Sequence, residues 1–116
     1  MKTETRIEIL AKHLGTSADN IRQSEYDKEV FECEGKEYLV LTNSEADDRF
    51  DIALDDYIEN CILSACPDMV SRYFDRAAWK RDAWYDGRGH SLAGYDGIEH
   101  AVHRSEGVYA YIYRIN

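Results

Sequence analysis

The chain has 116 residues and carries 23 acidic against 14 basic side chains, a formal net charge of −9. Its hydrophobic content of 44% suits one folded domain with a single core and excludes a disordered chain. It contains neither an apolar run long enough for a membrane helix nor the apolar region of a signal peptide, which predicts a cytosolic protein. Its acidity argues against direct nucleic-acid binding, because such binding needs a basic patch to neutralise phosphates.

The N-terminal segment predicts a pair of short helices. Residues 5–14 have the apolar spacing of an amphipathic helix, with Thr5 and Glu8 as a capping box. A second helix is predicted from about residue 17 to Gln23, started by a hydroxyl cap. This pair is similar to the first half of a helix-turn-helix. A recognition helix, however, carries base-reading and phosphate-contacting side chains along one face. Acidic residues follow here instead, so we predict a structural helix pair and keep the DNA-binding helix-turn-helix as an alternative.

A hairpin and a long helix are predicted next. Glu29–Leu41 is rich in strand-forming residues, with Glu34-Gly35 at the turn. From Ser44 to Ala65 apolar residues recur at steps of three and four, which indicates one face of a helix. Thr42 and Glu45 match the capping box that starts such a helix.

The opposite face of this helix is acidic. It carries Glu45, Asp48, Asp51, Asp55 and Glu59, flanked by Asp47 and Asp56, with Arg49 as its only base. Carboxylates at this spacing lie roughly 5–6 Å apart and repel one another. The wider stretch from Glu25 to Glu59 holds 13 acidic and 3 basic residues, so its field attracts basic surfaces. The set predicted to bind a partner is Glu25, Asp27, Glu29, Glu32, Glu37, Glu45, Asp48, Asp51, Asp55, Asp56 and Glu59. A face that is merely solvated is the other interpretation.

The second half of the chain predicts a helix, a glycine-rich loop and a closing hairpin. Asp75 should cap a helix that runs to about Tyr85, with Trp79 directed to the core. Asp86–Gly97 has four glycines and is predicted to form turns. The last hairpin pairs a strand over 98–103 with one over 108–115, in which tyrosines alternate with other residues.

These elements predict the α+β class. We expect a single small domain over residues 1–116, in which two antiparallel hairpins, able to join in one sheet, pack with three to four helices including the long acidic one.

No residue pattern points to catalysis, a cofactor or a metal. Cys33, Cys61 and Cys66 are odd in number and form no C-x-x-C pair, so free and buried thiols are predicted. The chain has no cofactor fingerprint and no ordered pair of nucleophile and base. We therefore predict a protein that is not an enzyme and has no catalytic, cofactor-binding or metal-binding residues.

One stretch of the C-terminal half has a recognisable pattern, Arg72-Tyr73-Phe74-Asp75-x-x-x-Trp79-x-Arg81-Asp82, before the loop and the tyrosine-rich strand. It resembles the repeating module of the ArdA-type antirestriction proteins over about 40 residues. The whole chain is also similar to small phage-encoded proteins that share the stretches EYLVLT, DGRGHSLA-x-YDG and YIYR-x-N.

This resemblance implies a DNA mimic. ArdA-type proteins present rows of carboxylates that stand in for phosphates and occupy the DNA channel of a host restriction complex. The implied partner of this chain is a basic nucleic-acid-binding surface of a restriction or CRISPR complex, without direct contact to nucleic acid or membrane. Its negative charge is concentrated outside the matching stretch, in residues 25–59. A homodimer stays open, as does a phage or bacterial interaction module with an unrelated partner.

Overall fold

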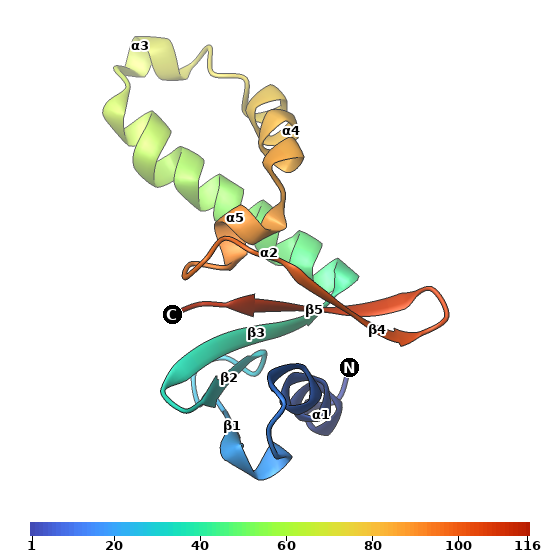
Figure 1. The fold of residues 1–116 in the computed structure, drawn as a ribbon. Coiled ribbons are helices and arrows are strands. Elements are labelled where there is room, and N and C mark those ends of the chain that lie inside the picture. Colours follow the sequence, from blue (N-terminus) through green and yellow to red (C-terminus); the bar gives the residue numbers. More distant parts are fainter.

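The computed structural model describes residues 1–116 and contains one five-stranded antiparallel sheet with helices on both faces (Figure 1). The strand order is β1-β2-β3-β5-β4, so the two predicted hairpins join in one sheet and the α+β prediction is confirmed. The strands are β1 (Ile21–Gln23), β2 (Val30–Cys33), β3 (Lys36–Thr42), β4 (His100–Ser105) and β5 (Val108–Arg114). The α-helices are α1 (Thr3–Leu14), α2 (Asn43–Tyr57), α3 (Asp68–Ser71), α4 (Arg76–Asp86) and α5 (Arg88–Leu92). None of them combines the length and hydropathy of a membrane-crossing helix.

Each face of the sheet has its own apolar core. Strand residues alternate between faces, so Phe31 and Val40 pack against Leu10 of α1. On the other face Leu41 and Tyr113 pack against α2 and α5. The turn between β2 and β3 has positive φ at both of its central residues, 53° at Glu34 and 78° at Gly35, as the predicted two-residue hairpin requires.

The N-terminal predictions are partly wrong. Helix α1 begins at Thr3, with Lys2 as an N-cap that makes no side-chain bond, so the predicted capping box is absent. The second helix is absent too, since a single 3₁₀ turn over Ala18–Asn20 leads directly into β1. Ile21 pairs there with Cys33 of β2. Backbone pairing in the sheet thus overrides the helical pattern, and the helix-turn-helix alternative is wrong.

The acidic helix follows its prediction closely. The Thr42 hydroxyl accepts a hydrogen bond from the Glu45 amide at 3.2 Å, and the Glu45 carboxylate accepts one from the Thr42 amide at 2.8 Å. Beyond α2 the chain continues through a π-helical turn, Ile58–Ile62, and a 3₁₀ turn, Leu63–Ala65. The helical path therefore reaches Ala65 as predicted.

Residues 59–88 form what we call the arm. It projects from the sheet along the continuation of α2, turns at α3 and returns as α4 (Figure 1), and it contributes to principal extents of 55 × 32 × 22 Å. No residue of the arm is buried. Trp79 stacks on Tyr57 with a centroid distance of 5.5 Å, and Trp84 meets Phe50 edge-on at 5.0 Å. Both tryptophans nevertheless stay partly or largely exposed, so the prediction that Trp79 belongs to the core is wrong.

The glycine-rich loop is more ordered than predicted. Positive φ at Gly87 (89°) and Gly97 (72°) confirms turns at its two ends. Between them α5 packs against the sheet, and Ala93 just behind it is buried. Gly89 lies so close to the chain at 97–99 that a Cβ atom would come within 2.7 Å of the Gly97 carbonyl oxygen.

The three cysteines are free, but only Cys33 is buried; Cys61 is exposed and Cys66 half-buried. Burial raises the pKa of the Cys33 thiol, and the thiolate is the reactive form. We therefore expect Cys61 and Cys66 to react with a disulfide reagent in the dilute native protein, and Cys33 to react only on unfolding. Absorbance with and without guanidinium measures this, and Cys33→Ala should abolish the delayed reaction. Three equally fast thiols would contradict the buried position of Cys33.

Candidate interaction surfaces

Many of the predicted partner-binding carboxylates have a cation partner within the chain. Glu45 binds the buried Arg6, whose two terminal nitrogens lie 2.9 and 2.7 Å from its carboxylate oxygens. Arg49 lies 2.7 Å from Asp27 and 2.8 Å from Glu29, and so ties α2 to the loop before β2. Hydrogen bonds from Arg6 are the main cause that lowers the pKa of Glu45 to about 2.

Helices α4 and α5 supply the other cations. Arg76 and Lys80 both lie 3.2 Å from Asp55, and their hydrogen bonds, that of Lys80 first, lower the Asp55 pKa. Arg76 also pairs with Glu59, and Lys80 with Asp51. Arg88 of α5 contacts Asp47 at 2.9 Å. These bases come from at least 17 residues further along the chain, so the helical spacing within α2 could not reveal them.

Five carboxylates of the predicted set make no ion pair within the chain. The paired members are Asp27, Glu29, Glu45, Asp51, Asp55 and Glu59. The unpaired members, which we call the free carboxylates, are Glu25, Glu32, Glu37, Asp48 and Asp56. They fall into two groups, one on the sheet and one on α2.

The first group lines a groove over β1, β2 and β3. Glu32 and Glu37 are directly opposite each other on β2 and β3, and like charges in such a pair are destabilising. Together with Glu25 and the 98% exposed Tyr26 they border a concavity of about 460 Å³. Arg22, directly opposite Glu32 on β1, is the cation in its lining and makes no ion pair. We call this region the acidic groove.

The second group lies on one side of α2. Asp48, Ile52 and Asp56 follow one another at steps of four, so they form one row on the helix. The row borders a concavity of about 810 Å³ between α2 and the loop before β2, whose lining also includes Arg6, Lys28 and Arg49. Ile52 is 60% exposed between the two carboxylates. This row presents an apolar side chain flanked by negative charge, a combination suited to a basic protein surface.

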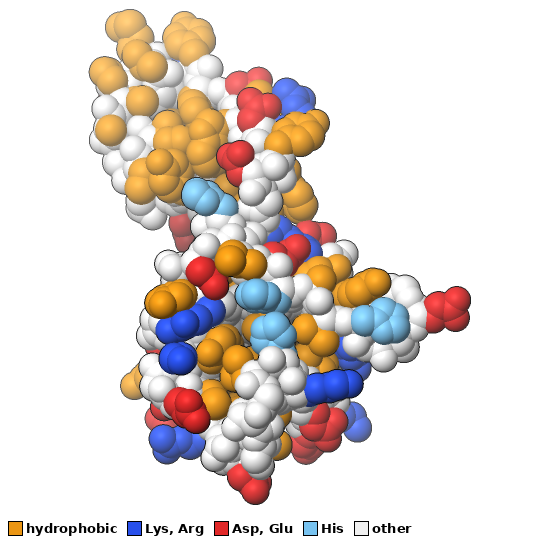
Figure 2. All heavy atoms as spheres, viewed as in Figure 1, with side chains coloured by type: hydrophobic (Ala, Val, Ile, Leu, Met, Phe, Trp, Pro, Cys, Tyr) orange, Lys and Arg blue, Asp and Glu red, His pale blue; other side chains and the backbone are white.

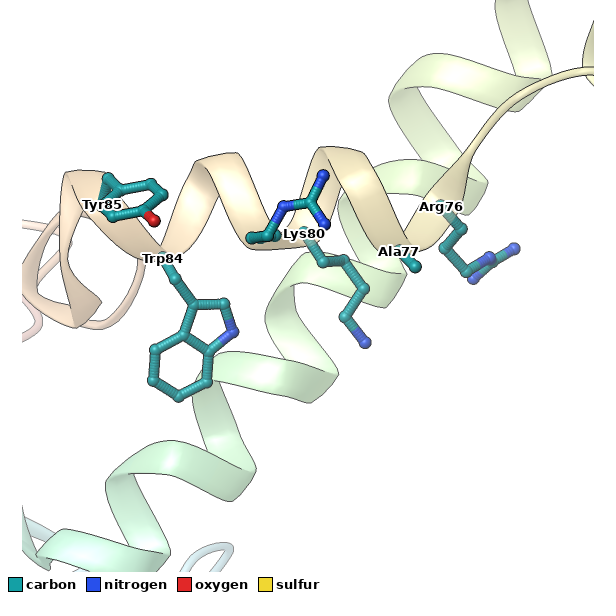
Figure 3. A pocket seen from close by; sticks show the side chains of 6 residues that line it. Arg76, Ala77, Lys80, Trp84 and Tyr85 are labelled. Atoms are coloured by element: carbon teal, nitrogen blue, oxygen red, sulfur yellow. The ribbon is translucent and has the colours of Figure 1, made fainter.

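A basic and aromatic hollow of about 750 Å³ lies on α4 (Figure 3). Its lining includes Arg76, Lys80, Arg81, Trp84 and Tyr85. In Figure 3 the Lys80 and Trp84 side chains extend from α4 towards α2, where Lys80 meets Asp51 and Asp55. Two of its three cations, Arg76 and Lys80, already pair with acidic residues of α2 and the turn that follows it. These residues therefore hold α4 on α2.

An apolar pocket of about 390 Å³ lies on the other side of the α2–α4 contact. Tyr57 and Trp79 form its walls, and Asp86, His90 and Ser91 also line it. Ser91 follows His90 directly in the sequence, and the fold places Asp86 at the same pocket. No hydrogen bond joins these three side chains, and no group of three metal-binding residues occurs in the structure. The prediction of a protein without catalytic activity stays a prediction.

Comparison with known proteins gives this chain no relative. No family model matches it, no curated protein matches it, and no solved structure matches it. The resemblance to the ArdA-type antirestriction proteins therefore stays a prediction from the sequence motifs.

Proposed function

We propose that this chain is an inhibitor of a bacterial nucleic-acid-targeting defence complex, of the antirestriction or anti-CRISPR kind. It occupies a basic nucleic-acid-binding surface of its target and so competes with DNA or RNA. The observation that carries the proposal is the set of five free carboxylates, which have no cation partner in a chain that pairs six other members of the same predicted set.

The acidic groove supports this proposal most directly. Glu32 lies opposite Glu37 on β3 and opposite Arg22 on β1, to which it makes no ion pair, so the cations of a partner would add to the relief of the repulsion between Glu32 and Glu37. DNA carries about one charge per 1.7 Å of its axis, so the groove is a sparser anion than a duplex. Lys and Arg of a nucleic-acid-binding surface are its complementary partners, and such pairing mainly accelerates association.

The choice of target rests on the sequence resemblance. ArdA-type proteins act on restriction complexes, and the stretch Arg72–Asp82 carries the likeness. Most of that stretch lies in α4 and the turn before it, where Arg76 and Lys80 hold the arm on α2. We therefore propose that the motif has a structural role in the arm and that the free carboxylates carry the inhibition.

A second candidate is an interaction module whose partner is unrelated to defence. The exposed apolar side chains of the arm favour it, since aromatic residues and Met are enriched where proteins bind one another. In that case partner binding depends on the arm and is insensitive to the free carboxylates.

Neutralising the free carboxylates tests the proposal. The variant replaces Glu25, Glu32 and Glu37 by Gln and Asp48 and Asp56 by Asn. We expect it to need at least about tenfold higher concentration to displace DNA from a purified restriction or CRISPR complex, because its contacts with Lys and Arg are lost. Fluorescence anisotropy of labelled DNA, at low and moderate salt, measures the displacement.

A matched control removes five charges elsewhere. Glu4, Glu8, Asp19, Asp82 and Glu106 are exposed and make no ion pair, so their amide variant has the same net charge. It should inhibit nearly as well as the parent. An equal loss of inhibition in both variants would mean that only the net charge matters. Unchanged inhibition by the free-carboxylate variant would exclude these carboxylates as the binding site. If the parent displaces DNA from none of the complexes, the second candidate is preferred.

A further inference from the structure

The outer end of the arm exposes a group of apolar side chains that nothing in the chain covers. Met69 is 75% exposed, Val70 55% and Tyr73 85%, and Cys61 beside the π-helical turn is exposed as well. We call residues 60–75 the arm tip. Figure 2 shows hydrophobic side chains gathered over this part of the molecule.

The arm lacks a core of its own. None of residues 59–88 is buried, although the segment contains two tryptophans, two tyrosines and several aliphatic residues. Its attachment includes one stacked ring pair, one edge-on ring pair and the ion pairs of Arg76, Lys80 and Arg88, most of which are partly exposed to water. Ion pairs of this kind contribute little against the entropy of ordering a long segment. A surface that covers the exposed apolar side chains would remove them from water and so supply the hydrophobic stabilisation that the arm lacks.

Charge identifies the covering surface. The arm, residues 59–88, contains five acidic and five basic residues and so has no net charge, and its tip has two acidic residues, Asp68 and Asp75, and one basic residue, Arg72. The whole chain carries −9, and two copies repel each other at their acidic surfaces. The arm tip is where two copies can meet with the least of that repulsion. A basic partner, in contrast, would be attracted to the free carboxylates.

We infer that two copies of this chain associate through their arm tips. A two-fold contact uses the same patch on both partners, and an apolar patch with little net charge is complementary to itself. The exposed apolar side chains of the arm tip, Met69, Val70 and Tyr73, would form the centre of the contact, and the polar residues around them would contribute the rest of the roughly 800 Å² per partner of a standard interface. Both sheets, with their acidic grooves, would then lie at opposite ends of the dimer. This inference is independent of the proposed inhibitory function.

Sedimentation of the full chain over a range of concentrations tests the inference. We expect a species of about 27 kDa, twice the 13.5 kDa of one chain, that dissociates on dilution. Val70→Asp should raise the dissociation constant at least about tenfold, because it places two like charges in an apolar contact. Tyr73→Ala is a second variant that adds no charge and should also weaken the dimer. Circular dichroism should be unchanged in both, since neither side chain is buried.

Tyr26→Asp is the matched control, because Tyr26 is the most exposed apolar side chain and lies far from the arm in the sequence. It should leave the dimer intact. A mixture of Val70→Asp and Val70→Lys should restore dimer, since the two introduced charges then attract. A chain that stays monomeric at its highest soluble concentration would overturn the inference. So would a dimer that resists both arm variants, because a different surface would then hold it.

Discussion

Replacing Arg6 by Ala is expected to lower the free energy of unfolding at pH 7 by about 3 kcal/mol, because the variant leaves a partly buried carboxylate without its cation. Arg6 is 6% exposed and joins three elements. From α1 its guanidinium donates to the Val40 carbonyl of β3 at 2.6 Å and to both carboxylate oxygens of Glu45 on α2. Urea unfolding measures the loss.

The effect of Arg6→Ala should depend on pH in a defined direction. The pKa of Glu45 falls from 4.5 to about 2 in the folded protein, chiefly through hydrogen bonds from Arg6. A lowered carboxyl pKa stabilises the fold above pH 4.5, and this contribution is lost as the pH falls towards 2. Parent and variant should therefore differ most at neutral pH and converge as the pH falls through this range.

Arg22→Ala is the control for this prediction. Arg22 is exposed and makes no ion pair, so the same substitution should change the stability by less than about 0.5 kcal/mol at either pH. A difference between parent and Arg6→Ala that persists undiminished near pH 2 would show that lost packing, rather than the charge pair, causes the effect.

Gly89→Ala is the second substitution with a large expected effect, a loss of about 3 kcal/mol. A Cβ atom at this position would lie 2.7 Å from the Gly97 carbonyl oxygen and 2.8 Å from the Glu99 amide nitrogen. These neighbours are backbone atoms, so the chain at 97–99 must move. That shift would displace Glu99, whose carboxylate accepts hydrogen bonds from Arg88, at 2.8 Å, and from the hydroxyl of buried Tyr113.

The sign of the change in stability distinguishes a crowded Gly89 from an unobstructed one. In an unobstructed helix the same change stabilises by up to about 1 kcal/mol, because Ala has the better helix propensity. Thermal unfolding should show a lower midpoint for Gly89→Ala than for the parent. Ser91→Ala, at an exposed position on the same helix, should leave the midpoint almost unchanged. A stabilised Gly89→Ala protein would mean that α5 does not approach the 97–99 segment this closely.

Local patterns in the sequence determined the elements whose signals lie within a few residues. The capping box of Thr42 and Glu45, the turn at Glu34-Gly35 and the Asp75 cap of α4 all form as predicted. Each depends on backbone groups three residues apart or closer, so neighbouring side chains suffice to specify it. The α+β class followed from the order of these elements.

Tertiary structure decided the elements whose hydrogen-bond or packing partners lie far away in the sequence. Ile21–Gln23 became a strand because β2 offers it hydrogen-bond partners, although its local sequence suggested a helix. Trp79 stayed outside the core because α4 packs only along α2 and no second layer covers it. Gly89 permits a backbone approach that no spacing in the sequence announces.

The acidic surface shows this division most clearly. The sequence alone determined the net charge of −9 and its concentration in residues 25–59. Which carboxylates remain available was decided by folding, because Arg6, Arg76 and Lys80 reach Glu45, Glu59, Asp51 and Asp55 from distant segments. The helical row of Asp48, Asp51, Asp55 and Glu59 looks uniform in the sequence, yet only Asp48 is free. Electrostatic pairing depends on distance in space, which the fold sets and the sequence spacing within one helix does not.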